Sequence, residues 1–414
     1  MDLELFEHIK DKNQMKLKHI ILALYLSLGP VVWFSDFTLG GIKRVLLVLL
    51  VFLYVPVLFK STNKISGLWY ILMLLLVLTI SLIATNTLSS ENTIDTYLGI
   101  IENYICFVIG YISMSEDVLS NKKFVRLLLL IPILTCFLTI TNFLFSIPNW
   151  IAPTELSRSE TYANVGYEVA PLWKTGFSWG RNGWAGALSV ILPISLFLKN
   201  NRYITVVWIV IGLSILLSGS RNGVVAIITT FVIWEFFMRG KTNFSFGKII
   251  LLFAIIASVI GVDVLFSRFL DSEDISAGRF EQYDLIPQAL SEIGFWGMGM
   301  NGSYNYLYAH GAGMHALHNA YVRVFIDYGF LVGFIVMGLM IFVIGRIIYC
   351  LRTKDKESSR LAIILMIGLM LAMFEPTAML GSLGAYSIWW FTLGCVLQNN
   401  KKNRYASVVL NQQV

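Results

Sequence analysis

The stretch Tyr328-Gly-Phe-Leu-Val-Gly-Phe-Ile-Val-Met-Gly-Leu-Met-Ile-Phe-Val-Ile-Gly345 decides the class of fold. It runs for 18 residues without a charged side chain, and a helix that crosses a bilayer needs about 20 mainly apolar residues. The whole chain agrees with it, because 57% of its 414 residues are hydrophobic and only 14% are charged. An ordinary soluble domain has about 25% charged residues. The composition excludes a soluble enzyme, a secreted disulfide scaffold and a disordered chain.

Eleven other apolar runs extend this interpretation along the chain. Twelve spans of about 20 residues would fill about 240 positions, which is close to the apolar content. The sequence therefore predicts an all-α polytopic membrane protein with about 12 transmembrane helices, forming a single integral membrane domain over residues 1–414. The predicted spans begin near His19, Val45, Gly67, Tyr97, Phe124, Trp184, Tyr203, Gly223, Ile249, Tyr328, Leu361 and Gly384.

The distribution of Lys and Arg predicts the orientation of these spans. Cytoplasmic loops keep these residues, whereas short translocated loops have few of them. With the N-terminus inside, 22 of the 31 Lys and Arg residues fall on the cytoplasmic side. Both termini are then cytoplasmic, and two long segments, residues 148–183 and 267–327, lie outside. Lys43 and Arg44, at the edge of a span, are an exception to the rule.

The cations on the predicted outer side are mostly arginines. Six of the seven are Arg, whose planar group binds phosphate oxygens in a bidentate manner and stays charged at cellular pH. The net charge of +6 is small, and its placement indicates an outer surface that binds phosphate, with no nucleic-acid partner. These cations are Arg158, Lys174, Arg181, Arg221, Arg268, Arg279 and Arg323.

Arg221 lies in the tight polar connection Ser218-Gly219-Ser220-Arg221-Asn222-Gly223, between two apolar runs. This places its guanidinium at the outer membrane surface, at the depth of the pyrophosphate of a lipid-linked substrate. The glycines would let backbone N–H groups approach that anion. The alternative is an arginine that reaches from a helix end to lipid headgroups.

Arg279 is predicted near the start of an amphipathic helix in the second long outer segment. Ser276 is its candidate N-cap, and an anion is favoured at a helix N-terminus. The alternative for Arg279 is a salt bridge to Asp274 or Glu281. The apolar residues that recur at helical spacing are Phe280, Tyr283, Ile286, Leu290 and Ile293.

Three of the five histidines, His310, His315 and His318, precede the tenth span. Histidine accepts a proton near neutral pH, so His318 is the candidate base that activates a sugar hydroxyl. One alternative is a zinc site of His315 and His318 with nearby carboxylates, which is a weak motif without a third defined ligand. Another is a structural role for His310 or His315. No metal or cofactor is predicted.

Two other groups of residues leave two interpretations open. Trp173, Trp179 and Trp184 near Arg181 indicate either a sugar-stacking platform or an interfacial aromatic belt. Charged residues in or near span ends, Glu102, Asp263 and Glu375, indicate either a proton path or helix packing. The four cysteines all fall in or at the ends of spans, which favours a role as small packing residues.

The order of motifs resembles the O-antigen ligase and Wzy-type polymerase superfamily. The resemblance covers about residues 181–333 and follows the turn around Arg221, Gly278-Arg279, Gly297-Met298-Gly299, His318-Asn319-Ala320-Tyr321, and Tyr328-Gly329 with Gly333. It implies a GT-C-like glycosyltransferase of the bacterial inner membrane, acting on the outer face. The donor would be an undecaprenyl pyrophosphate-linked glycan, and the acceptor another sugar.

The same resemblance implies roles for individual residues. Arg221 and Arg279 would hold the pyrophosphate and stabilise its charge as it leaves, and His318 would activate the acceptor hydroxyl. We expect the other substrate contacts to come from Ser220, Asn319, Arg181, Arg158, Trp179 and Tyr283.

The superfamily contains polymerases, which join lipid-linked repeat units, and ligases, which transfer the glycan to lipid A core. The stretch from Gly176 to Trp184 resembles polymerases, and Arg158 and Arg181 offer cations for a second pyrophosphate. We therefore favour a polymerase, with a chain-length regulator as a further candidate partner, and a ligase as the alternative. A lipid-linked oligosaccharide flippase is the alternative from another class, although a transporter would place its charges along a path at mid-membrane depth.

Overall fold

The computed structural model describes most of the chain, and within this part every regular element is a helix. Side chains at a few helix ends are not described. The described residues are 15–29, 39–61, 67–88, 91–145, 181–198, 200–218, 220–238, 247, 250, 279–311, 317–353, 355–374 and 386–411. The helices are α2 (Leu17–Ser27), α3 (Leu39–Ser61), α4 (Gly67–Ala84), α5 (Glu91–Ser115), η3 (Val118–Ser120), α6 (Lys122–Phe145), α9 (Arg181–Ile191), η4 (Leu192–Phe197), α10 (Asn201–Leu217), α11 (Arg221–Met238), α14 (Arg279–Glu292), α15 (Gly302–Ala309), α16 (Ala320–Arg352), α17 (Lys356–Ala372) and α18 (Ser387–Asn411).

The all-helical prediction is confirmed for the described part of the chain. Eleven of the twelve predicted apolar runs coincide with a described helix, and the run that begins near Ile249 lies almost wholly outside the described residues. Within the described part of the chain, three helices are long and apolar enough to cross a membrane: Thr96–Ser115 within α5, Lys122–Phe145 and Ala320–Arg352. The total of twelve spans stays a prediction.

The closest helix packing in the core joins α5 and α18. A Cβ atom added to Gly110 would lie 2.0 Å from the carbonyl oxygen of Phe391, and one added to Gly394 would lie 2.0 Å from that of Phe107. Small residues let helix backbones approach in this way, as they do in membrane bundles. The four cysteines, Cys106, Cys136, Cys350 and Cys395, are buried thiols, which agrees with their predicted packing role.

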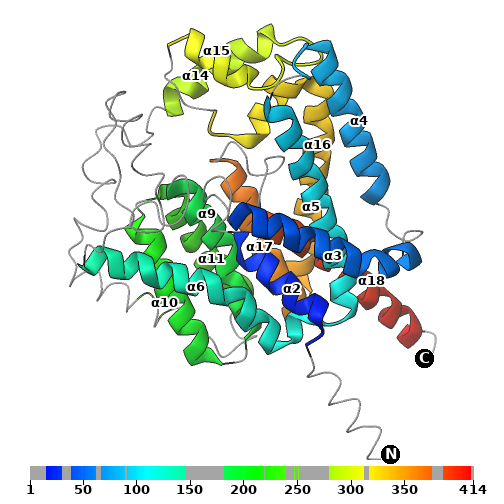
Figure 1. Ribbon diagram of the computed structural model, residues 1–414, viewed down its shortest axis with the longest axis vertical. Helices are drawn as coiled ribbons and strands as arrows, with labels where there is room; N and C mark the ends of the chain where they lie inside the picture. Colours follow the sequence, from blue (N-terminus) through cyan, green and yellow to red (C-terminus); the bar gives the residue numbers. More distant parts are fainter. Residues whose placement is uncertain are drawn as a thin grey trace, which may run out of the picture.

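The helices α14 and α15 lie together at one end of the molecule, beside the upper ends of α4 and α16 (Figure 1). They cover a small apolar core of their own, which includes Ala289, Ile293, Leu317 and Ile326. The sequence predicted the helix at α14 and part of its apolar face, since Ile286 and Leu290 pack against this core and Ile293, directly after the helix, is buried in it. Gln282 and Ala289, which were not in the predicted set, are also buried.

A junction of two glycines attaches this end to the bundle. Gly297 and Gly329 both have positive φ, +82°, and Gly329 interrupts α16. A Cβ atom on Gly297 would lie 2.4 Å from the Gly329 nitrogen, and one on Gly329 would lie 2.3 Å from the Phe295 oxygen. Ser81 of α4 also binds this junction. Its hydroxyl lies within hydrogen-bond distance of two backbone carbonyl oxygens, that of Trp296 at 2.9 Å and that of Tyr328 at 3.0 Å. Only glycine satisfies both the backbone angle and the close approach.

Replacing Gly329 by Ala is expected to lower the free energy of unfolding by about 2 kcal/mol or more, because strain and a backbone clash add together. The control is Gly338→Ala in the same helix, where an added Cβ meets nothing within 4 Å. That change is expected to be neutral or to stabilise by up to about 1 kcal/mol. Thermal unfolding of both variants in detergent measures the difference, and equal midpoints would contradict the junction.

Glu116, directly after the C-terminal end of α5, lies in a cluster with Lys18 and His19. Glu116 accepts from Lys18 at 2.5 Å and pairs with the His19 Nε2 atom at 2.6 Å, so that α2 is tied to the end of α5. The hydrogen bond to His19 and the positive charge of Lys18 lower the pKa of Glu116 to about 2, against the opposing effect of partial burial.

A carboxylate whose pKa is lower in the folded than in the unfolded protein stabilises the fold above its unfolded pKa. The contribution of Glu116 is therefore complete above about pH 4.5 and is lost as the pH falls towards about 2. We expect Glu116→Gln to lower the thermal midpoint at neutral pH, and the gap between variant and parent to narrow in acid. Midpoints measured at several pH values test this, and a gap that does not change with pH would refute it.

Candidate functional site

Three of the predicted outer arginines lie at the described starts of helices. Arg221 is the first residue of α11, and Arg181 and Arg279 are the first described residues of α9 and α14. The first N–H groups of a helix have no partner inside the helix and carry partial positive charge, so a helix start favours an anion. An arginine at that position adds a full positive charge to the same place. For Arg181 and Arg279 the structure describes the backbone alone.

The starts of α9 and α11 are alike in sequence and adjacent in space. Both begin with Arg-Asn-Gly, at residues 181–183 and 221–223. The Ser220 hydroxyl donates to the Asn182 side-chain oxygen at 3.1 Å and accepts from the Gly223 N–H at 3.4 Å. The buried Ser220 is thus an N-cap that ties the two helices together, and its predicted contact with substrate stays a prediction. The repeated triplet was the sequence signal for this pairing, and the sequence analysis missed it.

The start of α16 is joined to the start of α11 through α17. The Asn222 side chain donates to the Phe374 oxygen at 3.4 Å, and the Tyr321 hydroxyl donates to the Leu369 oxygen at 2.8 Å. Leu369 lies in the last turn of α17 and Phe374 follows that helix. Asn319 caps α16, because its side-chain oxygen accepts from the N–H groups of residues 321 and 322. This capping bond is the role that the structure gives to Asn319.

The start of α14 is joined to the start of α16 by one bond. The backbone N–H of His318 donates to the side-chain oxygen of Gln282 at 3.4 Å, and Gln282 lies one helical turn after Arg279. The first turns of α9, α11, α14 and α16 are therefore connected in series, with α17 between α11 and α16. We call these first turns, residues 181–183, 220–223, 279–282 and 318–322, the helix-start cluster. It contains Arg181, Arg221, Arg279 and His318, which the sequence had singled out.

Arg323, another of the outer arginines, is used inside the fold. Its Nε donates to the Asp327 carboxylate at 2.9 Å and its Nη2 to the Asn301 side-chain oxygen at 3.2 Å. Asp327 is fully buried, and its other oxygen accepts from the Ser303 N–H at 2.7 Å. These bonds hold the start of α15 against α16, and they account for Arg323 without a phosphate.

Trp184 and His310 are the members of the aromatic and histidine groups whose packing the structure describes in detail. Trp184 is fully buried within α9, so it is neither an interfacial belt residue nor an open stacking platform. His310 is the C-cap of α15, and its Nδ1 atom lies 2.9 Å from the backbone carbonyl oxygen of Tyr306. Its ring stacks on the Tyr306 ring, with 4.1 Å between the ring centroids. This contact agrees with the structural alternative for His310. Tyr283 lies half-buried on α14, between the core-facing side and the surface.

Several predicted residues lie outside the described part of the chain. Arg158, Trp179 and His315 belong to this set, as do Asp263, Asp274 and Glu375. Among the described residues, no group of three or more metal-ligating side chains is close enough to hold a metal ion.

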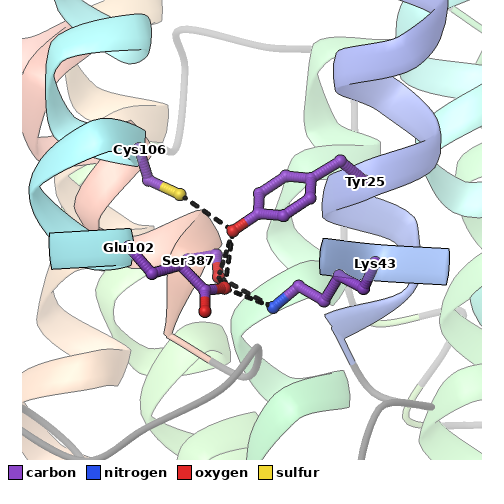
Figure 2. A network of polar contacts seen from close by, with 5 residues as sticks. All are labelled: Tyr25, Lys43, Glu102, Cys106 and Ser387. Carbon is purple, nitrogen blue, oxygen red and sulfur yellow. Dashed lines mark hydrogen bonds and ion pairs between the residues drawn. The ribbon is translucent and has the colours of Figure 1, made fainter. Parts of the chain in front are cut away.

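A second polar cluster lies inside the bundle and pairs two residues that the sequence analysis considered separately (Figure 2). Lys43 of α3, the exception to the orientation rule, contacts Glu102 of α5 at 2.6 Å. The hydroxyl of Tyr25 donates to Glu102 at 2.5 Å, and that of Ser387 donates to it at 3.1 Å. Cys106 lies 3.4 Å from the Tyr25 oxygen. The side chain of Lys43 is only 2% exposed.

This buried network connects α2, α3, α5 and α18. Because its lysine and carboxylate neutralise each other, Lys43 can be buried although it lies on the predicted outer side. Breaking one partner of a buried ion pair leaves an unpaired charge, which costs more than removing both. Glu102 was weighed as part of a proton path or as a packing residue, and its closed set of bonds favours packing.

Lys43→Met and Glu102→Gln are each expected to lower the free energy of unfolding by about 3 to 5 kcal/mol. The double variant has no buried unpaired charge, so we expect it to be more stable than either single variant. Lys123→Met, at an exposed position of α6, is the control with no expected loss. Thermal unfolding in detergent measures all four proteins. Losses that simply add in the double variant would show that the two side chains are not coupled.

Comparisons with known proteins add no family to this description. No protein-family model matches the chain, and no curated protein matches it.

Proposed function

We propose that this chain is a membrane glycosyltransferase that polymerises undecaprenyl pyrophosphate-linked oligosaccharide repeat units. The observation that carries the proposal is the helix-start cluster, in which Arg181, Arg221 and Arg279 lie at the described starts of three helices. Such a position combines a guanidinium with the positive end of the helix dipole, and both favour phosphate oxygens. A lipid pyrophosphate brings two adjacent phosphates to one surface.

The proposed reaction exchanges one bond for another at the donor sugar. The bond between the anomeric carbon and the pyrophosphate oxygen breaks, and a bond from the acceptor oxygen to that carbon forms. Arg221 and Arg279 stabilise the negative charge that develops on the leaving pyrophosphate. His318 accepts the proton of the acceptor hydroxyl. No metal or cofactor takes part in this scheme.

The proposal includes the topology expected from the sequence. The chain would cross the bacterial inner membrane about twelve times in a GT-C-like arrangement, with both termini in the cytoplasm and the helix-start cluster outside. The described helices support this arrangement in one respect. Hydrogen bonds connect the described starts of α9 and α11 to each other and, through α17, to the starts of α16 and α14.

A polymerase is favoured over a ligase by the pairing of α9 and α11. A polymerase handles two lipid pyrophosphates, one on each substrate, and the two adjacent Arg-Asn-Gly starts offer two neighbouring positions for an anion. In a ligase the acceptor is lipid A core, and one pyrophosphate site is enough. A flippase would need charges along an open path, whereas the buried charges Lys43 and Glu102 bind each other.

In purified protein supplied with lipid pyrophosphate-linked repeat units, Arg221→Lys is expected to lower the elongation rate about 100-fold, because lysine lacks the bidentate fork. His318→Ala is expected to lower it by about 100-fold or more. Arg202→Lys is the matched control, since Arg202 is an exposed arginine in the first turn of another helix, α10. We expect the control to keep the parent rate, with chain length read on a gel.

The products separate the three candidate functions. Elongation without lipid A core supports the polymerase, and transfer that requires the core replaces it with the ligase. If the purified protein makes no glycosidic bond and cells that carry the variants trap the donor on the inner leaflet, the chain is a flippase. Full elongation by both site variants would defeat the assignment of Arg221 and His318.

A further inference from the structure

Gln282 is a polar side chain at a position where the core of α14 expects an apolar one. It shares a buried face with Ala289 and Ile293 and is only 1% exposed. Burying a side-chain amide is unfavourable unless the amide is hydrogen-bonded. Its side-chain oxygen accepts a hydrogen bond from the backbone N–H of His318 at 3.4 Å.

The backbone of His318 is held on both sides as well. Leu317 is fully buried in the small core under α14, and Asn319 caps α16 through the N–H groups of Tyr321 and Val322. The bond from His318 to Gln282 joins this fixed segment to the first turn of α14. Gln282 and Arg279 are three residues apart on that helix, which separates them by about 4.5 Å along its axis.

We infer that Gln282 is a positioning residue, which sets His318 relative to Arg279. The inference rests on the proposed function, because it concerns the distance between the base that activates the acceptor and the arginine that holds the donor pyrophosphate. Errors of about 1 Å in such distances can lower a rate by about 100-fold. Gln282 itself acts through the backbone of His318 and therefore changes the rate of the chemical step more than the binding of the donor.

The test compares two substitutions of similar length at Gln282. Gln282→Met removes the accepting oxygen, whereas Gln282→Glu keeps an oxygen that can accept from His318. We expect Gln282→Met to lower kcat for elongation about tenfold with little change in KM for the donor, and Gln282→Glu to retain most of the parent kcat. Gln288→Met, on the exposed side of the same helix, is the matched control and should leave both constants unchanged.

Hydrogen exchange supplies a readout that does not depend on glycosyl transfer. In Gln282→Met, the peptide that contains the His318 amide should exchange faster than in the parent, and peptides of α17 should not change. If the parent protein has no transferase activity, the proposed function fails, and the exchange result still decides whether Gln282 holds His318.

Two results would overturn the inference. One is a Gln282→Met variant with the parent kcat and the parent exchange rate. The other is an equal loss of kcat in the Met and Glu variants, because a purely structural role does not distinguish them. If Gln282→Met does not accumulate in cells, Gln282→Asn replaces it in the comparison with Gln282→Glu. The Asn side chain is one methylene shorter, which moves its amide oxygen away from the His318 N–H.

Discussion

Backbone hydrogen bonding is the constraint from which the other features of this molecule follow. In an apolar environment every N–H and C=O group must find a partner within the protein, and helices provide one along their length. Only the helix ends leave groups free. In this chain hydrogen bonds connect several helix starts in series, and three of the described starts carry arginine. The positive end of a helix dipole and a guanidinium charge both favour the same kind of ligand, an oxyanion.

The helix-start cluster is held in place by bonds that involve few side chains. Ser220, Asn222, Gln282 and Tyr321 each make one bond to a neighbouring helix or its end. The positive-φ pair Gly297 and Gly329 fixes the attachment of α14 and α15 to α16. These residues give the site its shape without carrying charge. A site assembled from separate helices needs such contacts, because each helix would otherwise be free to slide against the next.

The two sets of charged residues serve different physical ends. Lys43 and Glu102 are buried together and neutralise each other (Figure 2). Their contacts stabilise the packing of α2, α3, α5 and α18. Arg323 and Asp327 do the same between α15 and α16. The predicted site instead uses arginines at helix starts. The count of seven outer cations therefore overstates the number that can bind phosphate, because Arg323 is paired with Asp327.

The helical class, the positions of eleven apolar helices and the presence of a helix at α14 could be predicted from the residues alone, because hydrophobic runs act locally. The sequence also identified Arg221, Arg279 and His318 as candidates. Only the tertiary structure decided that Trp184 is buried, that Lys43 pairs with Glu102 and Arg323 with Asp327, and that Gln282 contacts His318. Each of these contacts joins different helices or depends on how helices pack. Local periodicity carries no information on which helices become neighbours, so the sequence left these pairs open.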